Sequence, residues 1–166
     1  PDADFAGMYR HEKPTDPACA KSCSGFVIVF AGVPVLWQSK LQTQTALSTM
    51  EAEVIALGAC MKELIPIMDM VQSLAVAVGI SAGDVNMRVS VHEDNSGALV
   101  LAETLPPQFM PRSKYYATKT IWFREEINRR GIKLLKIETS EQLGDMFTKG
   151  LAKPAFEYLR SKIIGW

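Results

Sequence analysis

The feature that most constrains the fold is a change of hydrophobic period near residue 48. Residues 25–32 (GFVIVFAG) and 33–40 (VPVLWQSK) are rich in β-branched and aromatic side chains and meet at a short turn, which predicts an antiparallel hairpin. From Ser48 onward, apolar residues recur every three or four positions, which predicts a helix to about Pro66 with a kink or continuation beyond it. A hairpin followed by an apolar helix indicates an α/β layer architecture.

The rest of the chain continues this alternation. Residues 1–22 predict the end of a strand followed by a loop. Further strands are expected at 86–94 and 132–138, and further helices at 95–104, 112–130, 140–151 and 153–164. With 166 residues, 48% of them apolar, we expect one domain over residues 1–166 with a mixed sheet flanked by helices.

The charge and cysteine content bear on the possible partners of the chain and on its cellular compartment. Lys plus Arg equals Asp plus Glu at 18 each, so net charge indicates neither a nucleic-acid nor a membrane partner. Three cysteines without framework spacing favour reduced thiols in an intracellular compartment. The apolar runs are interrupted too early to span a bilayer, so we expect no membrane association. We also expect the isolated domain to be monomeric.

Two glutamates near the start of the predicted long helix have different expected roles. Ser48 and Glu51 fit a capping box, in which each side chain satisfies a backbone N–H of the first turn. Glu53 instead falls within the apolar stripe, where a carboxylate is costly unless it is paired or binds a cation. A cation site at Glu53 is one interpretation, and a salt bridge reaching past the stripe is the other.

Aspartates elsewhere are further candidates. Asp94 stands where the predicted strand at 86–94 ends and the next helix begins, a position where α/β sheets present functional groups, although it is also a favoured helix N-cap. Asp145 lies in an amphipathic stretch and could simply be solvated. Asp2 and Asp4 precede a loop and could be turn residues.

Taken in order, these segments resemble the ribonuclease H domain of copia-type LTR retrotransposon polyproteins. The resemblance covers nearly the whole chain and rests on SGFVIVFAGVPVLWQSKLQTQTALSTMEAEVIAL, EDNSGAL, RSKYYATKTIWFREEI and ETSEQLGDMFTKGL. It implies an RNase H-like α/β fold: a five-stranded mixed sheet, its first three strands antiparallel, flanked by helices.

The resemblance also implies a site and an activity. Four carboxylates would hold two Mg²⁺ ions, for which Mn²⁺ could substitute, and would hydrolyse the RNA strand of RNA–DNA hybrids. In chain order they are Asp2 (with Asp4 as alternative), Glu53 (with Glu51 as alternative), Asp94 and Asp145. The implied setting is a cytoplasmic retrotransposon particle, with a reverse-transcriptase polymerase domain in the parent polyprotein as partner.

Substrate contacts are expected at two places. Asn95 and Ser96 could read 2′-hydroxyl groups in the minor groove, although helix capping explains them equally well. Arg112 and Lys114 are the best candidates for phosphate contacts. They belong to a basic and aromatic set that could equally form a solvated helix face: Lys40, Arg112, Lys114, Tyr115, Tyr116, Lys119, Trp122, Arg124, Arg129 and Arg130.

Two functions of different classes remain. One is a Mg²⁺-dependent ribonuclease H, and the other is a non-catalytic module that binds hybrid or tethers a reverse transcriptase. All four acids are present, which favours catalysis. A DDE-type nuclease or integrase on the same fold is disfavoured by the helix glutamate that follows the hairpin.

Overall fold

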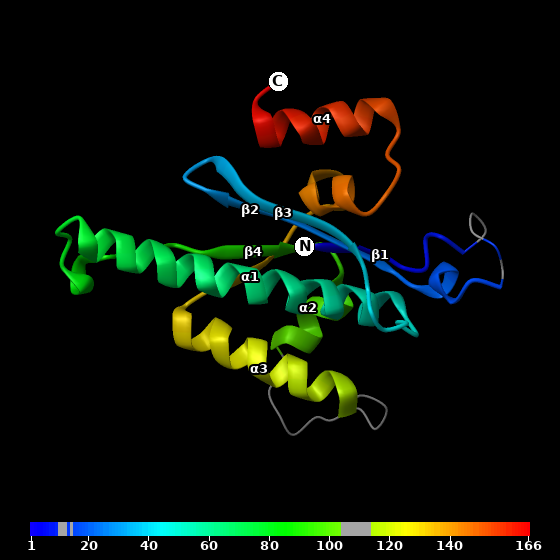
Figure 1. Cartoon of the computed structure of the whole chain (residues 1–166), viewed down its shortest axis with the longest axis horizontal. Coiled ribbons are helices and arrows are strands. Elements are labelled where there is room, and N and C mark those ends of the chain that lie inside the picture. Colours follow the sequence, from blue (N-terminus) through cyan, green and yellow to red (C-terminus); the bar gives the residue numbers. More distant parts are fainter. Residues whose placement is uncertain (10–12, 14, 104–113) are drawn as a thin grey trace.

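A computed structural model of the chain describes residues 1–9, 13, 15–103 and 114–166, with side chains described from residue 120 onward in the last range (Figure 1). Three antiparallel strands form one sheet in the order β1-β2-β3: β1 Asp2–Asp4, β2 Cys23–Phe30 and β3 Val33–Leu41. Asp2 pairs with Gly25, so the first strand lies along the beginning of β2.

The predicted hairpin is confirmed. Phe30 pairs with Val33, and the two residues between them, Ala31 and Gly32, have φ angles of 50° and 83°. Positive φ at both central positions matches the twist of a tight two-residue hairpin, and glycine adopts it without steric cost. The hairpin holds Phe26 of β2, which is fully buried, over the helix that follows.

The prediction of a single five-stranded sheet is wrong. Strands β4 (Ser90–Glu93) and β5 (Lys133–Lys136) pair in parallel with each other and form a separate two-stranded sheet. A ladder between β1 and β4 could join only three residues to four, so it would gain few hydrogen bonds. The α/β arrangement, with its first three strands antiparallel, remains compatible with an RNase H-like fold.

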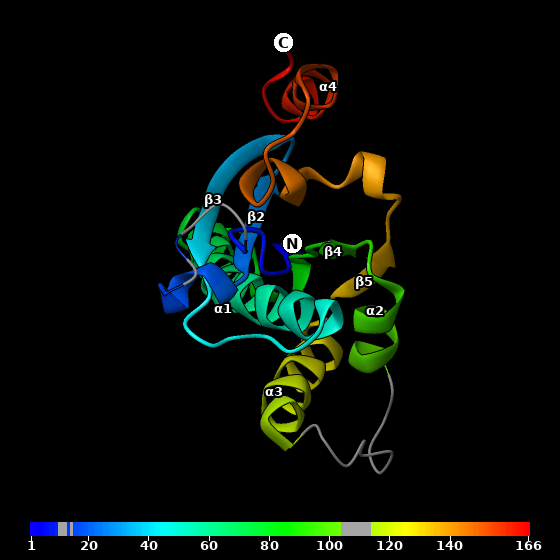
Figure 2. The ribbon, with the colours of Figure 1, turned by 90° about the vertical axis from the view of Figure 1, so that its right-hand side faces the viewer.

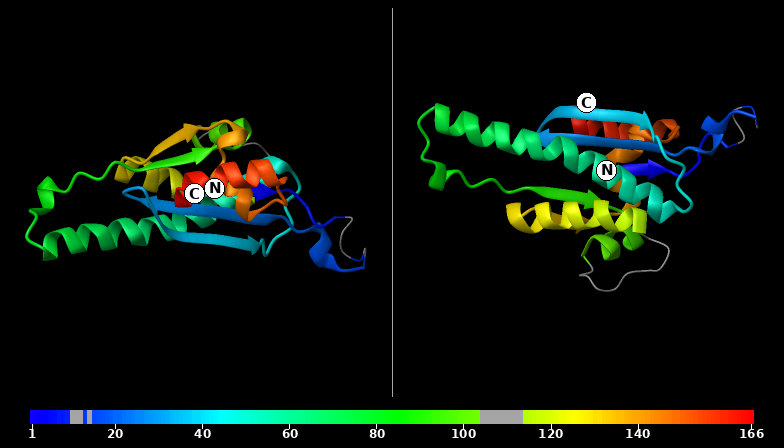
Figure 3. Two further views of the ribbon diagram at one scale, coloured as in Figure 1. Left: turned by 90° about the horizontal axis from the view of Figure 1, so that it is seen from above. Right: turned by 60° about the horizontal axis from the view of Figure 1, so that its bottom comes forward.

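Helix α1 (Thr49–Ala77) continues well beyond Pro66, the continuation being one of the two outcomes expected there. Pro66 lies inside the helix, where it removes one backbone donor without ending it. The first half of the helix faces the core, and its Val54, Leu57 and Met61 are fully buried against Phe26 and Phe123. The second half extends past the hairpin turn (Figure 3).

The other predicted helices are present, with one exception. Helices α2 (Ser96–Glu103), α3 (Lys114–Arg130) and α4 (Lys153–Ile164) match the expected segments. The helix expected over 140–151 is replaced by two short 3₁₀ helices, η3 (Thr139–Glu141) and η4 (Leu143–Phe147). Two more 3₁₀ turns lie in loops, η1 (Pro17–Ala20) and η2 (Ala82–Asp84).

Close backbone contact explains why 140–151 is irregular. A Cβ on Gly144 would lie 2.6 Å from Cβ of Asp2, and one on Gly25 would lie 2.7 Å from Cβ of Phe147. Glycine at both positions therefore lets η4 touch β1 and β2 directly. This contact brings the residues after Gly144 beside Asp2.

The elements are layered around the hairpin. Helices α1 and α4 lie on opposite faces of β2 and β3, and α3 lies beyond α1 (Figures 1 and 2). Strands β4 and β5 lie beside the first sheet, next to α2 (Figure 2). Within the described ranges, no helix combines the length and apolar character needed to cross a bilayer.

Candidate metal centre

Three of the four predicted acids come together from three different elements. Asp2 of β1, Glu53 of α1 and Asp94, which directly follows β4, each offer a carboxylate oxygen, and these atoms all lie within 4.8 Å of one another. Asp2 is fully buried and Glu53 is 4% exposed. Carboxylates this close and this buried repel one another unless a proton or a cation balances their charge.

The start of α1 sets which glutamate joins this group. Ser48 is the N-cap, and its Oγ accepts a hydrogen bond from the backbone N–H of Glu51 at 3.2 Å, the serine half of the predicted capping box. Glu53, two residues further on, faces Asp2 and Asp94. Glu51, the alternative candidate, is also buried, but it does not belong to the group of close carboxylates among the described residues.

Glu53 has the most unfavourable electrostatic environment of the group. Its Oε2 is buried without a hydrogen-bond partner among the described residues. Burial, followed by the negative charges of Glu93, Asp2 and Asp94, raises the pKa of Glu53 to about 9. A buried carboxylate with an unpartnered oxygen, close to two other carboxylates, is in an environment that a cation would relieve.

Asp145 joins the cluster through a lysine. It is 6% exposed, and its Oδ1 accepts a hydrogen bond of 2.8 Å from Nζ of Lys149. The same Nζ donates to Oδ1 of Asp2 at 3.2 Å. Burial raises the pKa of Asp145 to about 6 despite its bond to Lys149. Asp145 therefore lies on the Asp2 side of the cluster, outside the group of three.

Two threonines hold the aspartates in place. Thr139 Oγ1 donates to Oδ2 of Asp94 at 2.9 Å, and Thr148 Oγ1 donates to Oδ2 of Asp2. Such outer hydrogen bonds fix the orientation of carboxylates that bind metals.

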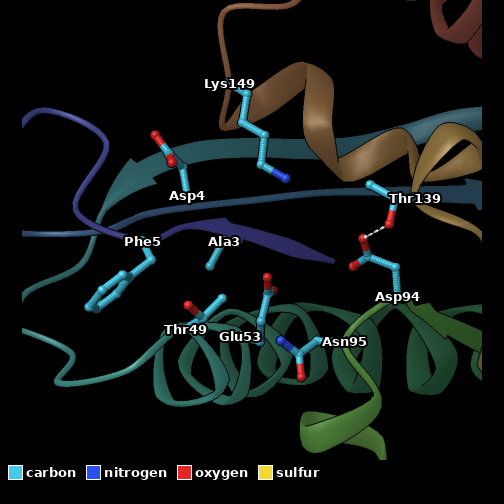
Figure 4. A pocket seen from close by; sticks show the side chains of 9 residues that line it. All are labelled: Ala3, Asp4, Phe5, Thr49, Glu53, Asp94, Asn95, Thr139 and Lys149. Atoms are coloured by element: carbon cyan, nitrogen blue, oxygen red, sulfur yellow. Dashed lines mark hydrogen bonds between the residues drawn. The ribbon is translucent and has the colours of Figure 1, made fainter.

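Glu53 and Asp94 open onto a pocket of about 510 Å³. Figure 4 shows Glu53, Asp94 and the amine of Lys149 directed into it, and the full lining is Ala3, Asp4, Phe5, Thr49, Glu53, Asp94, Asn95, Thr139 and Lys149. Asp4 lines this pocket but does not belong to the group of three close carboxylates. Of the two N-terminal candidates, Asp2 is therefore the one in contact distance of Glu53 and Asp94.

The predicted substrate-contacting residues have mixed outcomes. Asn95 lines the pocket, and its Oδ1 also accepts a hydrogen bond from the N–H of Ala98 at 3.0 Å, so it caps α2. Ser96 is exposed in the first turn of α2. Arg112 and the side chain of Lys114 lie outside the described residues, as do the side chains of Tyr115, Tyr116 and Lys119.

Part of the basic set in α3 is engaged within the molecule. Arg124 donates to the carbonyl oxygens of Leu101 and Ala102, the latter at 3.0 Å. Arg129 and Arg130 both bond Glu126, and Arg130 also bonds Asp69 of α1. Arg124 and Arg130 therefore join α3 to neighbouring helices, which makes them poor candidates for phosphate contacts, whereas Arg129 pairs, among the described residues, only within α3 and its side chain is 64% exposed.

Sequence reasoning missed four residues of the centre: Glu93, Thr139, Thr148 and Lys149. Glu93 is fully buried, its Oε2 has no partner among the described residues, and burial raises its pKa to about 7. The alternation of β4 carried a signal for Glu93, since Val91 is buried two positions earlier. The other three lie on η3 or just after η4, where no periodicity exists to follow.

Comparison with known proteins adds a context for this centre. The chain is 32% identical over 162 residues, 98% of its length, to the retrovirus-related Pol polyprotein from transposon TNT 1-94 of Nicotiana tabacum. The chain is similar to one segment of transposon Pol polyproteins. The transposon RE1 polyprotein of Arabidopsis thaliana is 28% identical over 162 residues, and the Ty1-DR1 Gag-Pol polyprotein of Saccharomyces cerevisiae is 26% identical over 144 residues.

The similarity covers the chain but only a small part of each relative. The chain spans about a tenth of the length of the plant Pol polyproteins that it matches: 11% of the tobacco protein and 10% of the Arabidopsis protein. No family model matches the chain, and no solved structure matches it. The similarity is therefore to one segment of these polyproteins.

Proposed function

We propose that this chain is a ribonuclease H domain that hydrolyses the RNA strand of RNA–DNA hybrids in a divalent-cation-dependent reaction. The observation that carries the proposal is the meeting of Asp2, Glu53 and Asp94 within 4.8 Å, with a buried oxygen of Glu53 left without a partner among the described residues. The similarity to Pol polyproteins supports it, because such polyproteins encode several enzymatic activities.

The residues present fit a hard cation such as Mg²⁺ or Mn²⁺. All the donors are carboxylate oxygens, the ligand type that these ions prefer, and no thiol or imidazole belongs to the described group. Asp2, Glu53 and Asp94 would hold one ion, and Asp2 with Asp145 would hold a second. Bound there, the ions would activate a water molecule and stabilise the leaving 3′ oxygen.

The chain's own side chains would prepare the site for this chemistry. Thr139 and Thr148 keep the Asp94 and Asp2 carboxylates in fixed orientations. Asn95, at the pocket wall, offers its amide N–H₂ to a ribose 2′-hydroxyl while its Oδ1 caps α2.

The similarity to segments of Pol polyproteins supports the setting that we propose. The domain would act within a Pol polyprotein that also carries a reverse-transcriptase polymerase domain. It would remove template RNA during reverse transcription, inside retrotransposon particles in the cytoplasm.

A cleavage assay on the purified chain tests the proposal. A labelled RNA–DNA hybrid is incubated with the chain and Mg²⁺ or Mn²⁺, alongside Asp94→Asn and Glu53→Gln variants and single-stranded and duplex RNA controls. We expect the unaltered chain to cut only the RNA strand of the hybrid, and each variant to lose the activity. Binding of hybrid without cutting under all conditions would overturn the proposal in favour of a non-catalytic hybrid-binding module.

A further inference from the structure

Lys149 contacts two carboxylates of the acid cluster at once. The backbone N–H of Lys149 donates to the carbonyl of Asp145 at 3.0 Å, and this turn directs the lysine side chain back over the aspartate. Its Nζ then reaches Oδ1 of Asp145 at 2.8 Å and Oδ1 of Asp2 at 3.2 Å. One ammonium group therefore bridges two carboxylates that come from opposite ends of the chain.

Lys149 supplies a positive charge beside two carboxylates that water reaches poorly. The side chains of Asp2 and Asp145 are 0% and 9% exposed, whereas that of Lys149 is 34% exposed. Both carboxylates lie within hydrogen-bond distance of the Lys149 ammonium group, and a lysine side chain is ordinarily charged at neutral pH. The lysine therefore stays charged and serves as a cation held in place by the chain itself.

On the Glu53–Asp94 side of the cluster, Lys149 lines the same pocket but acts only through its more distant charge. Among the described residues, no Lys or Arg forms an ion pair with either of these carboxylates, and the Asp94 partner is the neutral Thr139 hydroxyl. The two sides of the cluster therefore differ in whether a positively charged side chain of the protein bonds their carboxylates.

We propose that Lys149 is a built-in counter-ion of the Asp2–Asp145 pair, which a divalent cation must displace before both carboxylates can hold it. The site would then take two ions in unequal steps, tightly at the Glu53–Asp94 side and weakly at the Asp145 side. Mg²⁺ binds carboxylate oxygens at about 2.0–2.1 Å, and an ammonium group bonded to the same oxygens occupies that space. This inference rests on the metal site of the proposed function.

Measurement of Mn²⁺ binding to the full chain, in the absence of nucleic acid, tests the inference. Calorimetry and electron paramagnetic resonance are used to count the ions and determine both affinities for the unaltered chain and for Lys149→Met, Lys149→Arg and Lys153→Met. Lys153 is the matched control, since its side chain is 83% exposed and 3.9 Å from Glu157. All readouts are independent of cleavage.

The expected result is a gain in affinity on removing a charge. Lys149→Met should tighten the second Mn²⁺ site by at least about fivefold, the lower end of usual coupling between two ligands. Lys149→Arg should keep the second site weak, and Lys153→Met should change neither site. A second affinity that is unchanged or lower in Lys149→Met would overturn the inference and assign Lys149 a purely structural role.

A measurement on the unaltered chain covers the case in which Lys149→Met does not fold. The Nζ ammonium signal of Lys149 is followed by ¹⁵N NMR during Mg²⁺ titration. It should lose its protection from exchange as the second ion binds, and a signal that stays protected at saturation would overturn the inference. If the unaltered chain binds no Mn²⁺ at all, the proposed function fails as well; equal binding by the unaltered chain and Lys149→Met overturns only the role of Lys149.

Discussion

The two sides of the acid cluster balance their buried charge in different ways. On the Glu53–Asp94 side, a glutamate oxygen is buried without a partner among the described residues, and burial raises the pKa of Glu53 to about 9. On the Asp2–Asp145 side, Lys149 bonds both carboxylates. The first side requires a proton or an ion from solution, whereas on the second the ammonium group of Lys149 already offsets one of the two negative charges.

This difference also follows the regularity of the backbone. Glu53 lies on a long helix whose first half is rigidly packed in the core, whereas Asp145 and Lys149 lie on and after a 3₁₀ turn pressed against β1. A metal ligand on a regular element is held more precisely than one on a loop. We therefore expect changes on the Glu53 side to have the larger effects.

The largest effect should come from Glu53→Gln. Loss of this ligand should lower hybrid cleavage by about 1,000-fold, because a bound metal contributes several kcal/mol to the transition state. Steady-state cleavage rates at saturating Mg²⁺ provide the measurement. Glu51→Gln is the matched control, two residues away and also buried, and it should retain activity. The opposite outcome for this pair would show that the assignment of the two glutamates is reversed.

A smaller effect is expected from Thr139→Val, which removes the hydrogen bond to Asp94. Loss of an outer partner typically lowers metal affinity by about 10- to 100-fold. Titration with Mn²⁺ should show this loss at the tighter site, while Ser140→Ala, an exposed neighbour, should bind normally. Normal Mn²⁺ affinity in Thr139→Val would remove Thr139 from the site.

Stability should depend on pH through the Glu53 side. Burial raises the pKa of Glu53 to about 9 and that of Glu93 to about 7, from ordinary values of 4.5. Between pH 4.5 and 9 these two glutamates bind more protons in the folded chain than in the unfolded chain. Their contribution to stability is therefore fully present below pH 4.5 and is lost as pH rises toward 9.

Thermal unfolding in the presence of a chelator measures this dependence. The melting temperature should fall by several degrees from about pH 5 to about pH 8, and Glu53→Gln should flatten the curve. Saturating Mg²⁺ should also flatten it, because the ion stabilises the ionised carboxylates. A melting temperature that rises with pH over this range would contradict the proposed charge state of Glu53.

The smallest effect should come from the helix cap. Ser48→Ala removes the acceptor for the N–H of Glu51 and should cost about 1 kcal/mol of stability. Chemical denaturation measures that loss. Cleavage at low temperature should be nearly unchanged, because the packing of α1 against Phe26 still fixes the position of Glu53. A large loss of activity without loss of stability would mean that the cap itself positions the ligand.

Regular elements made part of this arrangement predictable. Helical period assigned Glu53 to the inward face of α1, and the strand-to-helix boundary singled out Asp94; both meet in the cluster. The separate β4–β5 sheet was not predictable from pattern, because strand pairing depends on which edges meet in three dimensions. Lys149 was not predicted for a related reason. Its position depends on the contact of Gly144 with Asp2, which links residues far apart in the chain.

The position of a bound divalent ion tests the proposed centre most directly. Crystals of the chain soaked in Mn²⁺ would reveal the ion by its anomalous scattering. We predict a strong peak bonded to carboxylate oxygens of Asp2, Glu53 and Asp94, with the Oε2 of Glu53 among its ligands. If crystals soaked in saturating Mn²⁺ showed no peak between these three side chains, or showed the ion elsewhere, the assignment of this cluster as the metal centre would be contradicted.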